Sequence, residues 1–551
     1  MGEPEAKATP ELATDPKIKK GVKDLALPVK PAAAKCCLGL ADGVRKAASP
    51  EEAKEARRQM GLRVEEKGKV WDGGVVPMMV AALGQSKEKP VTEAISLAAA
   101  LALADSKENI ALAEAEGVEK VMVGCCRDKS LLVQAHACMA IGAVASAGTP
   151  DNLARLVSEG AMKALTTIAG AEDSAKTLEE QGVNKQIAYK CGQRQEEAAA
   201  ALHQVTTCDA AKDSAMQTGT LQTLIELAAN NKVIKIVGKK ETTETPAATA
   251  QAKVEAVGAL LNCATAAHNR ELLAQLGGIA PLVALLSHPE MRARERAAGT
   301  IHQMCLQQSL RGQVISANGV AALLALCNAA DATTLALVEA GGALQCLANE
   351  EAAKQELARR GAAATLCALL STVKPAGDEA AGAAALERQR AVMAEHALAV
   401  LAHMCVHGNG ALDNTPRAVL LLNETGNARL QDACAHTKKD GAGGSGVVEH
   451  VARLCAVQDA AVSGQAVAAM AALCCRHADN AREAGRCRGP KVAMALLLQQ
   501  SDDDVRIANV ILALQCMAEG FAGNVPAMLR MGATARLLAL HRLSASPQVE
   551  G

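Results

Sequence analysis

One pattern of glycines and helix-forming segments recurs along most of this 551-residue chain. Its clearest copy, HNRELLAQLGGIAPLVALLSHPEMRARERAAGTIHQMC from His268 to Cys305, predicts a short helix, a glycine hinge, a second helix, a turn and a third helix. Glycine tolerates the positive φ that ends a helix. Neighbouring hinges are 41–43 residues apart, or 59–66 at four places, so the period is about 42 residues with insertions in the longer steps. The predicted hinges are Gly74, Gly117, Gly160, Gly219, Gly278, Gly319, Gly361, Asn427, Gly489 and Gly532.

The segments around each hinge have the pattern of amphipathic helices. Apolar residues recur at spacings of three and four in stretches such as VAALLALC and AKVEAVGALLNCAT. No sustained alternation predicts a strand; VIKIV (Val233 to Val237) has strand-like composition but lies in a predicted insertion. We therefore predict an all-α solenoid, in which each repeat packs only on its neighbours.

The unit resembles the armadillo repeat, because the core N-x3-LL-x3-GG-I-x-PLV-x-LL is nearly complete at 268–305. With the weaker copies, the resemblance covers roughly 72–551. It implies a right-handed superhelix of about ten three-helix repeats, whose third helices line a concave groove. HEAT repeats are the nearest alternative, but they lack the glycine hinge between a short first helix and a second helix.

Composition limits the partners of such a chain. Only 1% of the residues are aromatic, namely Trp71, Tyr189 and Phe521, so base-stacking platforms are missing. The net charge of −1 gives no global field that favours nucleic acid or anionic lipid. We expect protein partners and no nucleic acid, no small-molecule substrate and no stable membrane insertion. Nineteen cysteines without a recognisable signal peptide predict reduced core thiols and a cytoplasmic location, where association with the cytoskeleton is an option.

Three parts of the chain are predicted. Residues 1–20 are expected to be a disordered tail, since they are polar and contain little to bury. Residues 21–71 are expected to form a helical cap, and 72–551 the solenoid. Insertions are predicted near 171–190, 230–249, 371–387 and 437–458. The second of these is basic and then threonine-rich, which is typical of a flexible loop; a docking or phosphorylation loop is the alternative.

The resemblance also implies a binding row on the third helices. In armadillo proteins a recurrent asparagine there contacts the backbone of an extended peptide, and Asn262 matches it. Gln204, Gln303 and His403 fall at the equivalent place, and His302 flanks the row one residue earlier, as does His203. Neutral hydrogen-bonding side chains suit peptide amides. The alternative is a set of scattered polar residues on a solvated face.

The row is interrupted, and its surroundings differ from those of known armadillo proteins. Four equivalent positions are not amides or imidazoles: Ala143, Cys346, Ala472 and Cys516. Arg292, Arg294 and Arg296 add positive charge beside the row or belong to a solvated face. Importin α pairs each asparagine with a tryptophan one turn earlier, whereas Ala200, Gly258, Gly299 and Ala399 stand there in this chain. Binding of nuclear-localisation signals is therefore not expected, and the balanced charge does not indicate the basic groove of β-catenin.

No motif in the sequence indicates catalysis. GAGGSG at 441–446 has dinucleotide-type spacing but does not follow a strand. The groups His403, Cys405, His407 and Cys474, Cys475, His477 lack the paired-cysteine spacing of zinc sites. We expect no catalytic residue, no cofactor and no metal.

The sequence thus predicts a non-catalytic scaffold that binds a protein segment through the groove. Two alternatives stay open: a structural component of a cytoskeletal or ciliary assembly, and a myosin-directed chaperone of the UCS type.

Overall fold

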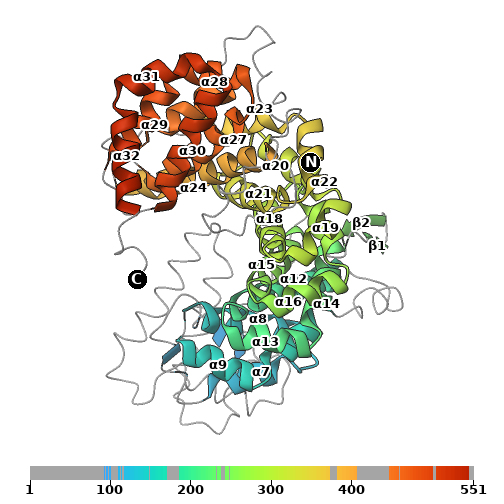
Figure 1. Cartoon of the computed structure of the whole chain (residues 1–551). Helices are drawn as coiled ribbons and strands as arrows, with labels where there is room; N and C mark the ends of the chain where they lie inside the picture. The colour runs from blue at the N-terminus through green and yellow to red at the C-terminus, as the bar shows by residue number, and fades with distance from the viewer. Residues whose placement is uncertain are drawn as a thin grey trace. The chain divides into compact units, whose positions relative to one another are not determined.

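The fold was described from a computed structural model (Figure 1). It describes residues 117–170, 185–230, 233–237, 242–246, 249–372, 381–405 and 446–544, apart from 148, 458 and 500–503, and single positions between 83 and 113. The predicted tail, the predicted cap and the hinges at Gly74 and Asn427 lie outside these residues. The chain divides into an N-terminal unit, 1–281, and a C-terminal unit, 282–551.

The N-terminal unit consists of helices in the repeating order first, second and third. Its second and third helices alternate with short first helices, as the hinge pattern predicts. The first helices are α9 (Pro150–Ser158), α13 (Asp209–Gln217) and α16 (Ala267–Gln275). The second helices are α7 (Val118–Cys125), α10 (Ala161–Ala169) and α14 (Thr220–Ala229), and α17 (Ile279–Leu285) contains the boundary between the units. The third helices are α8 (Leu131–Ala147), α12 (Lys185–Val205) and α15 (Ala250–Ala264), and consecutive third helices pack on each other.

The C-terminal unit continues the same order. Its first helices are α19 (Gln308–Ser316), α22 (Glu351–Arg359), α28 (Ala478–Arg486) and α31 (Val525–Arg530), the last preceded by the short helix η3 (Ala522–Asn524). Its second helices are α20 (Gly319–Cys327), α23 (Ala362–Ser371), α26 (Val447–Leu454), α29 (Gly489–Leu498) and α32 (Ala533–Ser544). Its third helices are α18 (Met291–Cys305), α21 (Thr334–Leu347), α24 (Ala381–Met404), α27 (Ala460–Cys474) and α30 (Asp504–Gly520), and each packs on the next. The predicted all-α solenoid is confirmed.

The predicted insertions contain ordered elements. The segment 230–249 forms an antiparallel hairpin of β1 (Val233–Val237) and β2 (Thr242–Pro246), so the interpretation as a flexible loop is wrong at these residues. Two β-branched runs separated by a short polar turn suffice for such a pair. The segment 437–458 contains α26, which contacts α23, α27 and α28. The parts 171–184, 373–380 and 437–445 lie outside the described residues.

The hinges take positive φ, but three of them do so one residue earlier than predicted. Gly277, Asn318 and Arg488 adopt φ of 76°, 62° and 62°, in place of Gly278, Gly319 and Gly489. The glycine that follows is needed for space. A Cβ on Gly319 would lie 2.5 Å from Val314 Cγ1 and 2.7 Å from the Val314 oxygen. At the hinges of Gly117, Gly160, Gly219, Gly361 and Gly532, the predicted glycine itself has the positive φ.

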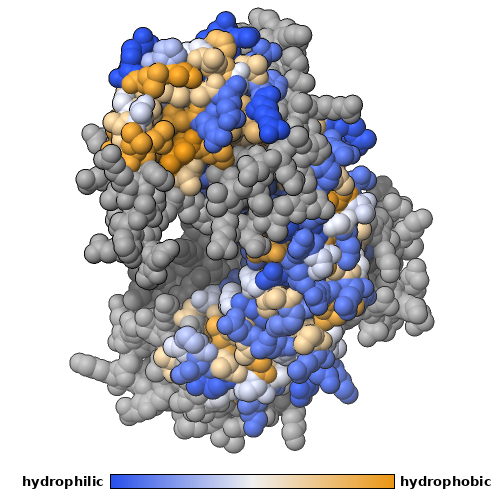
Figure 2. Space-filling model, viewed as in Figure 1, coloured by the Kyte–Doolittle hydropathy of each residue, from blue (hydrophilic) through white to orange (hydrophobic). Residues whose placement is uncertain are grey.

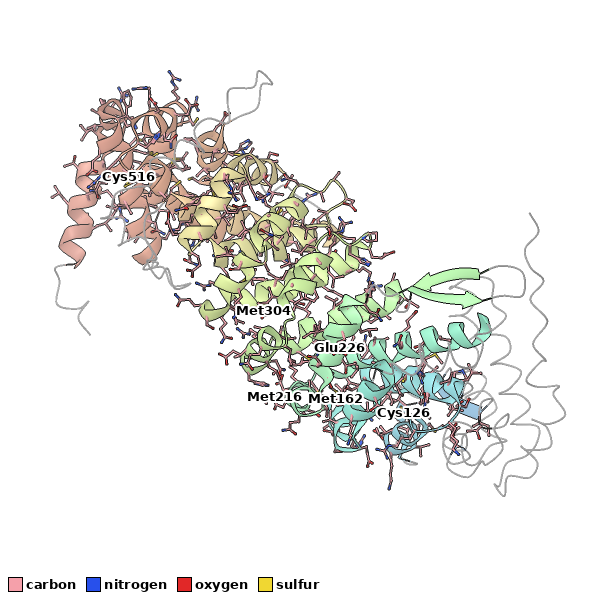
Figure 3. All side chains as sticks on the ribbon, turned by 90° about the vertical axis from the view of Figure 1, so that its right-hand side faces the viewer. Cys126, Met162, Met216, Glu226, Met304 and Cys516 are labelled. Atoms are coloured by element: carbon pink, nitrogen blue, oxygen red, sulfur yellow. The ribbon has the colours of Figure 1, made fainter. Side chains whose placement is uncertain are left out.

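Small aliphatic and sulfur-containing residues form the core. Met162 and Met304 are labelled among the packed helices in Figure 3 and are at most 1% exposed. Buried asparagines also join a first helix to the end of the third helix before it. Asn480 donates to the Leu473 oxygen and Asn524 to the Met517 oxygen, both at 2.9 Å. These bonds give the carbonyl groups in the last turn of each third helix a side-chain donor.

Two surface properties complete the description. Within the described residues, no single helix is long and apolar enough to cross a membrane; only α19 and α20 together, bent by 81°, reach that length and composition. Hydrophobic residues gather over the C-terminal helices in Figure 2. The leucines that expose most of their surface there are Leu498, Leu529 and Leu538.

Candidate protein-binding groove

The predicted positions lie at equivalent places on the third helices of each unit, and we call them the central row: Ala143, Gln204 and Asn262 in the N-terminal unit, and Gln303, Cys346, His403, Ala472 and Cys516 in the C-terminal unit. Gln204 and Gln303 are half-buried, and neither side-chain amide forms a hydrogen bond with another described residue. An amide of this kind keeps both a donor and an acceptor for a ligand. These two residues fit the predicted role best, one in each unit.

Asn262 is already engaged within the fold. Its Nδ2 donates to the backbone oxygen of His203 at 2.9 Å and lies 3.4 Å from Thr206 Oγ1. The side chain therefore links α15 to the C-terminal end of α12, and this donor is partly used before any ligand arrives. Asn262 is half-buried, in keeping with such a linking role.

His403, a predicted binding residue, is buried and so offers little of its surface to a ligand. Its residue is only 8% exposed, and burial lowers its pKa to about 4, helped by the positive charges of Lys354 and Arg311. Those two cations come from the first helices α22 and α19. A neutral, buried imidazole beside two cations is a core group. The sequence shows that a polar residue occupies this helix position, but it does not show that the side chain is buried.

A second polar row, missed by the sequence reasoning, lies two turns upstream on the same helices. We call it the upstream row: His136, Glu197, Glu255, Arg296, Glu339, His396, Gln465 and Asn509. Each stands seven residues before its central-row counterpart, and residues seven apart share a helix face. The sequence contains a signal for this row: every described third helix has a polar residue seven positions before its central-row residue.

Members of the upstream row pair with the helix before them. His203 Nδ1 donates to Glu255 Oε2 at 2.7 Å, and His302 Nδ1 donates to Glu339 Oε2 at 2.9 Å. His396 donates to Gln345 Oε1 at 2.6 Å. The first two pairs occupy equivalent positions in the N-terminal and C-terminal units. The predicted flanking residue His302 is therefore part of a bonded pair.

Burial sets the charge of several of these groups. The pKa of His136 is lowered to about 4 by burial, and the same is true of His396, with a further effect of the His302 charge. Burial raises the pKa of Glu197 to about 7, and the neighbouring Glu196 adds to the rise. The third helices therefore carry two neutral imidazoles, His136 and His396, and one carboxyl group, that of Glu197, whose pKa is raised.

The predicted arginines have different surroundings. Arg294 is buried and makes a bidentate bond to Asp331, whereas Arg292 is exposed and Arg296 half-buried. The three therefore do not form one positive patch.

A cavity of about 790 Å³ lies elsewhere, between α23, α26, α28 and α29, and Glu449, Arg453 and Glu483 are among its lining residues. In the part of the chain that the structure describes, no group of three His, Cys, Asp or Glu side chains is placed to hold a metal ion.

The clearest repeat is recognised by a family model. Residues 267–306 match the Armadillo/beta-catenin-like repeat, and the helices on either side repeat the same three-helix order. The chain has the armadillo-repeat fold. No curated protein compared with the chain matches it.

Solved structures are similar to this armadillo solenoid. A crystal structure of an engineered protein from the Northeast Structural Genomics Consortium superposes with a TM-score of 0.62 at 19% identity, over 91% of this chain and 98% of that one. Computationally designed armadillo repeat proteins for modular peptide recognition reach a TM-score of 0.40 at 19% identity, over 49% of this chain and 99% of theirs. A designed armadillo repeat protein in complex with the peptide (KR)4 gives 0.39 at 19% identity, over 49% of this chain and 99% of that one. The first of these likenesses shows a fold shared over most of the chain's length.

Proposed function

We propose that this chain is a non-catalytic armadillo scaffold that binds an extended protein segment along the face of its third helices. The observation that carries the proposal is the pair of half-buried amides of Gln204 and Gln303, which have no hydrogen-bond partner among the described residues. A primary amide can accept from a peptide N–H and donate to a peptide C=O, which suits an extended backbone. The designed armadillo proteins named above, made for peptide recognition, support the class of ligand.

The surroundings of the two amides support the same conclusion. Gln204 follows His203, which is fixed by Glu255, and Gln303 follows His302, which is fixed by Glu339. A fixed neighbour reduces the side-chain entropy that a ligand must remove on binding. We further propose a cytoplasmic location, which the buried thiols of Cys263, Cys305 and Cys455 support.

The proposal is tested with peptides selected from a displayed random library on the full chain. Affinities are then measured for the chain and for Gln204→Ala and Gln303→Ala. A neutral hydrogen bond contributes about 0.5–1.5 kcal/mol, so the variant in the unit that holds the peptide should weaken binding about 2- to 13-fold.

Glutamines outside the third helices provide matched controls. Gln222 lies on the second helix α14 and is half-buried, and Gln355 lies on the first helix α22 and is exposed. Gln222→Ala and Gln355→Ala should leave the affinity unchanged. Binding that is lost in these controls and kept in the third-helix variants would assign the site to another face of the solenoid.

A further inference from the structure

The last helix of the C-terminal unit exposes two leucines side by side in the sequence. Leu537 and Leu538 of α32 are 38% and 52% exposed. They stand five and six residues after Gly532, the hinge residue with positive φ. Leu529 of the neighbouring helix α31 is 56% exposed, and hydrophobic residues gather over the C-terminal helices in Figure 2. The end of this unit therefore carries an apolar surface that the helices described do not cover.

The equivalent positions of other second helices are buried. The residues five and six positions after the hinges at Asn318, Gly361 and Arg488 are at most 8% exposed. They are Leu323, Leu324, Leu366, Cys367, Ala493 and Met494. The exposure of Leu537 and Leu538 is therefore a property of the last repeat and not of this helix position.

A third helix accompanies each of these buried positions. In the C-terminal unit α20 packs on α21, α23 on α24 and α29 on α30, and these third helices have 14, 24 and 17 residues. By contrast, α32 packs on α29 and α31, and among the described residues no third helix follows it. It lies at the edge of the C-terminal unit (Figure 1). The apolar surface of α32 therefore corresponds to one that a helix covers in the other repeats.

The charges of these helices are all positive. Helices α29, α31 and α32 contain Lys491, Arg530, Arg536 and Arg542, and no aspartate or glutamate. Lys491 and Arg530 are exposed, whereas Arg536 is half-buried and its Nε donates to the Leu497 oxygen at 2.9 Å. The whole chain has a net charge of −1, so this excess of cations is local. A partner that complements the surface therefore has acidic groups beside an apolar face.

We propose that α31 and α32 form a docking surface for an acidic amphipathic helix of a partner protein. The apolar side of that helix covers Leu529, Leu537 and Leu538, and its carboxylates pair with the cations of α29, α31 and α32. The helix takes the place that a third helix has in the other repeats. The surface contains no residue of the central row, so this inference does not depend on the proposed peptide binding.

Two other occupants agree with fewer of these observations. A symmetric contact between two copies of the chain places the same patch on both sides, so the cations of one copy would face those of the other. An anionic membrane would satisfy the cations. It would leave unexplained why the exposed leucines stand where the other repeats have a covering helix.

The test selects helical peptides of about 18 residues, or five turns, from a displayed library on the full chain. The double variant Leu537→Glu, Leu538→Glu removes peptides that bind elsewhere. The peptides that remain should have leucines at spacings of three and four and a net negative charge. Leu538→Glu should weaken them at least about tenfold, because it buries a carboxylate that also repels the acidic helix. A selection that yields no peptide dependent on these leucines, or only basic or extended ones, would overturn the proposal.

Equivalent residues elsewhere in the unit provide matched controls. Arg530 and Arg359 each stand two residues before a hinge, in the first helices α31 and α22, and both are exposed. Arg530→Glu leaves the apolar contacts in place and should weaken the selected peptides about 1.5- to 5-fold, whereas Arg359→Glu should not. Leu335 of α21 is 43% exposed, and Leu335→Glu should also leave the affinity unchanged. Equal losses in the test variants and their controls would contradict docking at α31 and α32.

Three further measurements separate the partner helix from other occupants and from the groove. A dimer in sedimentation velocity that dissociates in Leu537→Glu, Leu538→Glu would assign the surface to a second copy and overturn the proposal. Binding to vesicles of phosphatidylcholine and phosphatidylserine that is lost in the same variant would assign it to a membrane, with the same consequence. The variant Gln204→Ala, Gln303→Ala should bind the selected helices with unchanged affinity, and a loss there would place them on the third helices instead.

Discussion

The N-terminal and C-terminal units contain the same histidine–glutamate pair, followed by different residues. Glu255 stands seven residues before Asn262, and Glu339 stands seven residues before Cys346. In the first unit Asn262 donates to the backbone of the preceding helix, whereas the equivalent residue of the second unit is the buried Cys346. The repeat therefore fixes which positions meet, and the residue at the central position decides whether a side-chain hydrogen bond links the two helices there.

The largest expected effect is on stability at alkaline pH. The pKa of His302 is raised from 6.5 to about 9 in the folded chain. A raised pKa stabilises the fold fully below pH 6.5, and this contribution is lost as the pH rises through about 9. We expect a loss on the order of 3 kcal/mol in the free energy of unfolding over this range, measured by urea denaturation.

His302→Gln should remove that alkaline loss from the C-terminal unit, and His203→Gln should not. If the unaltered chain unfolds with the same free energy on both sides of this pH range, the charged state of His302 is wrong.

Glu197 should have an influence of similar size, confined to the N-terminal unit. Burial raises its pKa from 4.5 to about 7, so the protonated carboxyl stabilises the fold below pH 4.5 and the contribution is lost as the pH rises through 7. Glu197→Gln should therefore stabilise the chain above pH 7 by on the order of 3 kcal/mol and have little effect near pH 4.5. The measurement is urea denaturation at both pH values, and destabilisation above pH 7 would argue against a buried, costly carboxylate.

The repeat period was predictable from the sequence, and the detail of each hinge was not. Where two hinge residues adjoin, as Asn318 and Gly319 do, the period cannot tell which adopts positive φ. The structure assigns it to Asn318, because Gly319 must stay small against Val314. The hairpin at Val233–Val237 was missed because a short strand-like run in an insertion carries little signal by itself.

The binding row was predictable as a set of positions but not as a set of available groups. Whether Asn262 or His403 is open to a ligand depends on residues in other helices, such as His203, Lys354 and Arg311. Pairs such as His302 and Glu339 are 37 residues apart, so no helical periodicity connects them. Only the packing of one third helix on the next brings them together.

The most direct test of the account is the affinity of a selected peptide for the double variant Gln204→Ala, Gln303→Ala, compared with the double control Gln222→Ala, Gln355→Ala. Since Gln204 and Gln303 belong to different units, a peptide held by either unit loses one hydrogen bond in the first variant, at about 0.5–1.5 kcal/mol. Its binding should weaken about 2- to 13-fold in the first variant and stay unchanged in the second. Unchanged binding in the first, or equal loss in both, would contradict the conclusion that the third-helix face holds the ligand.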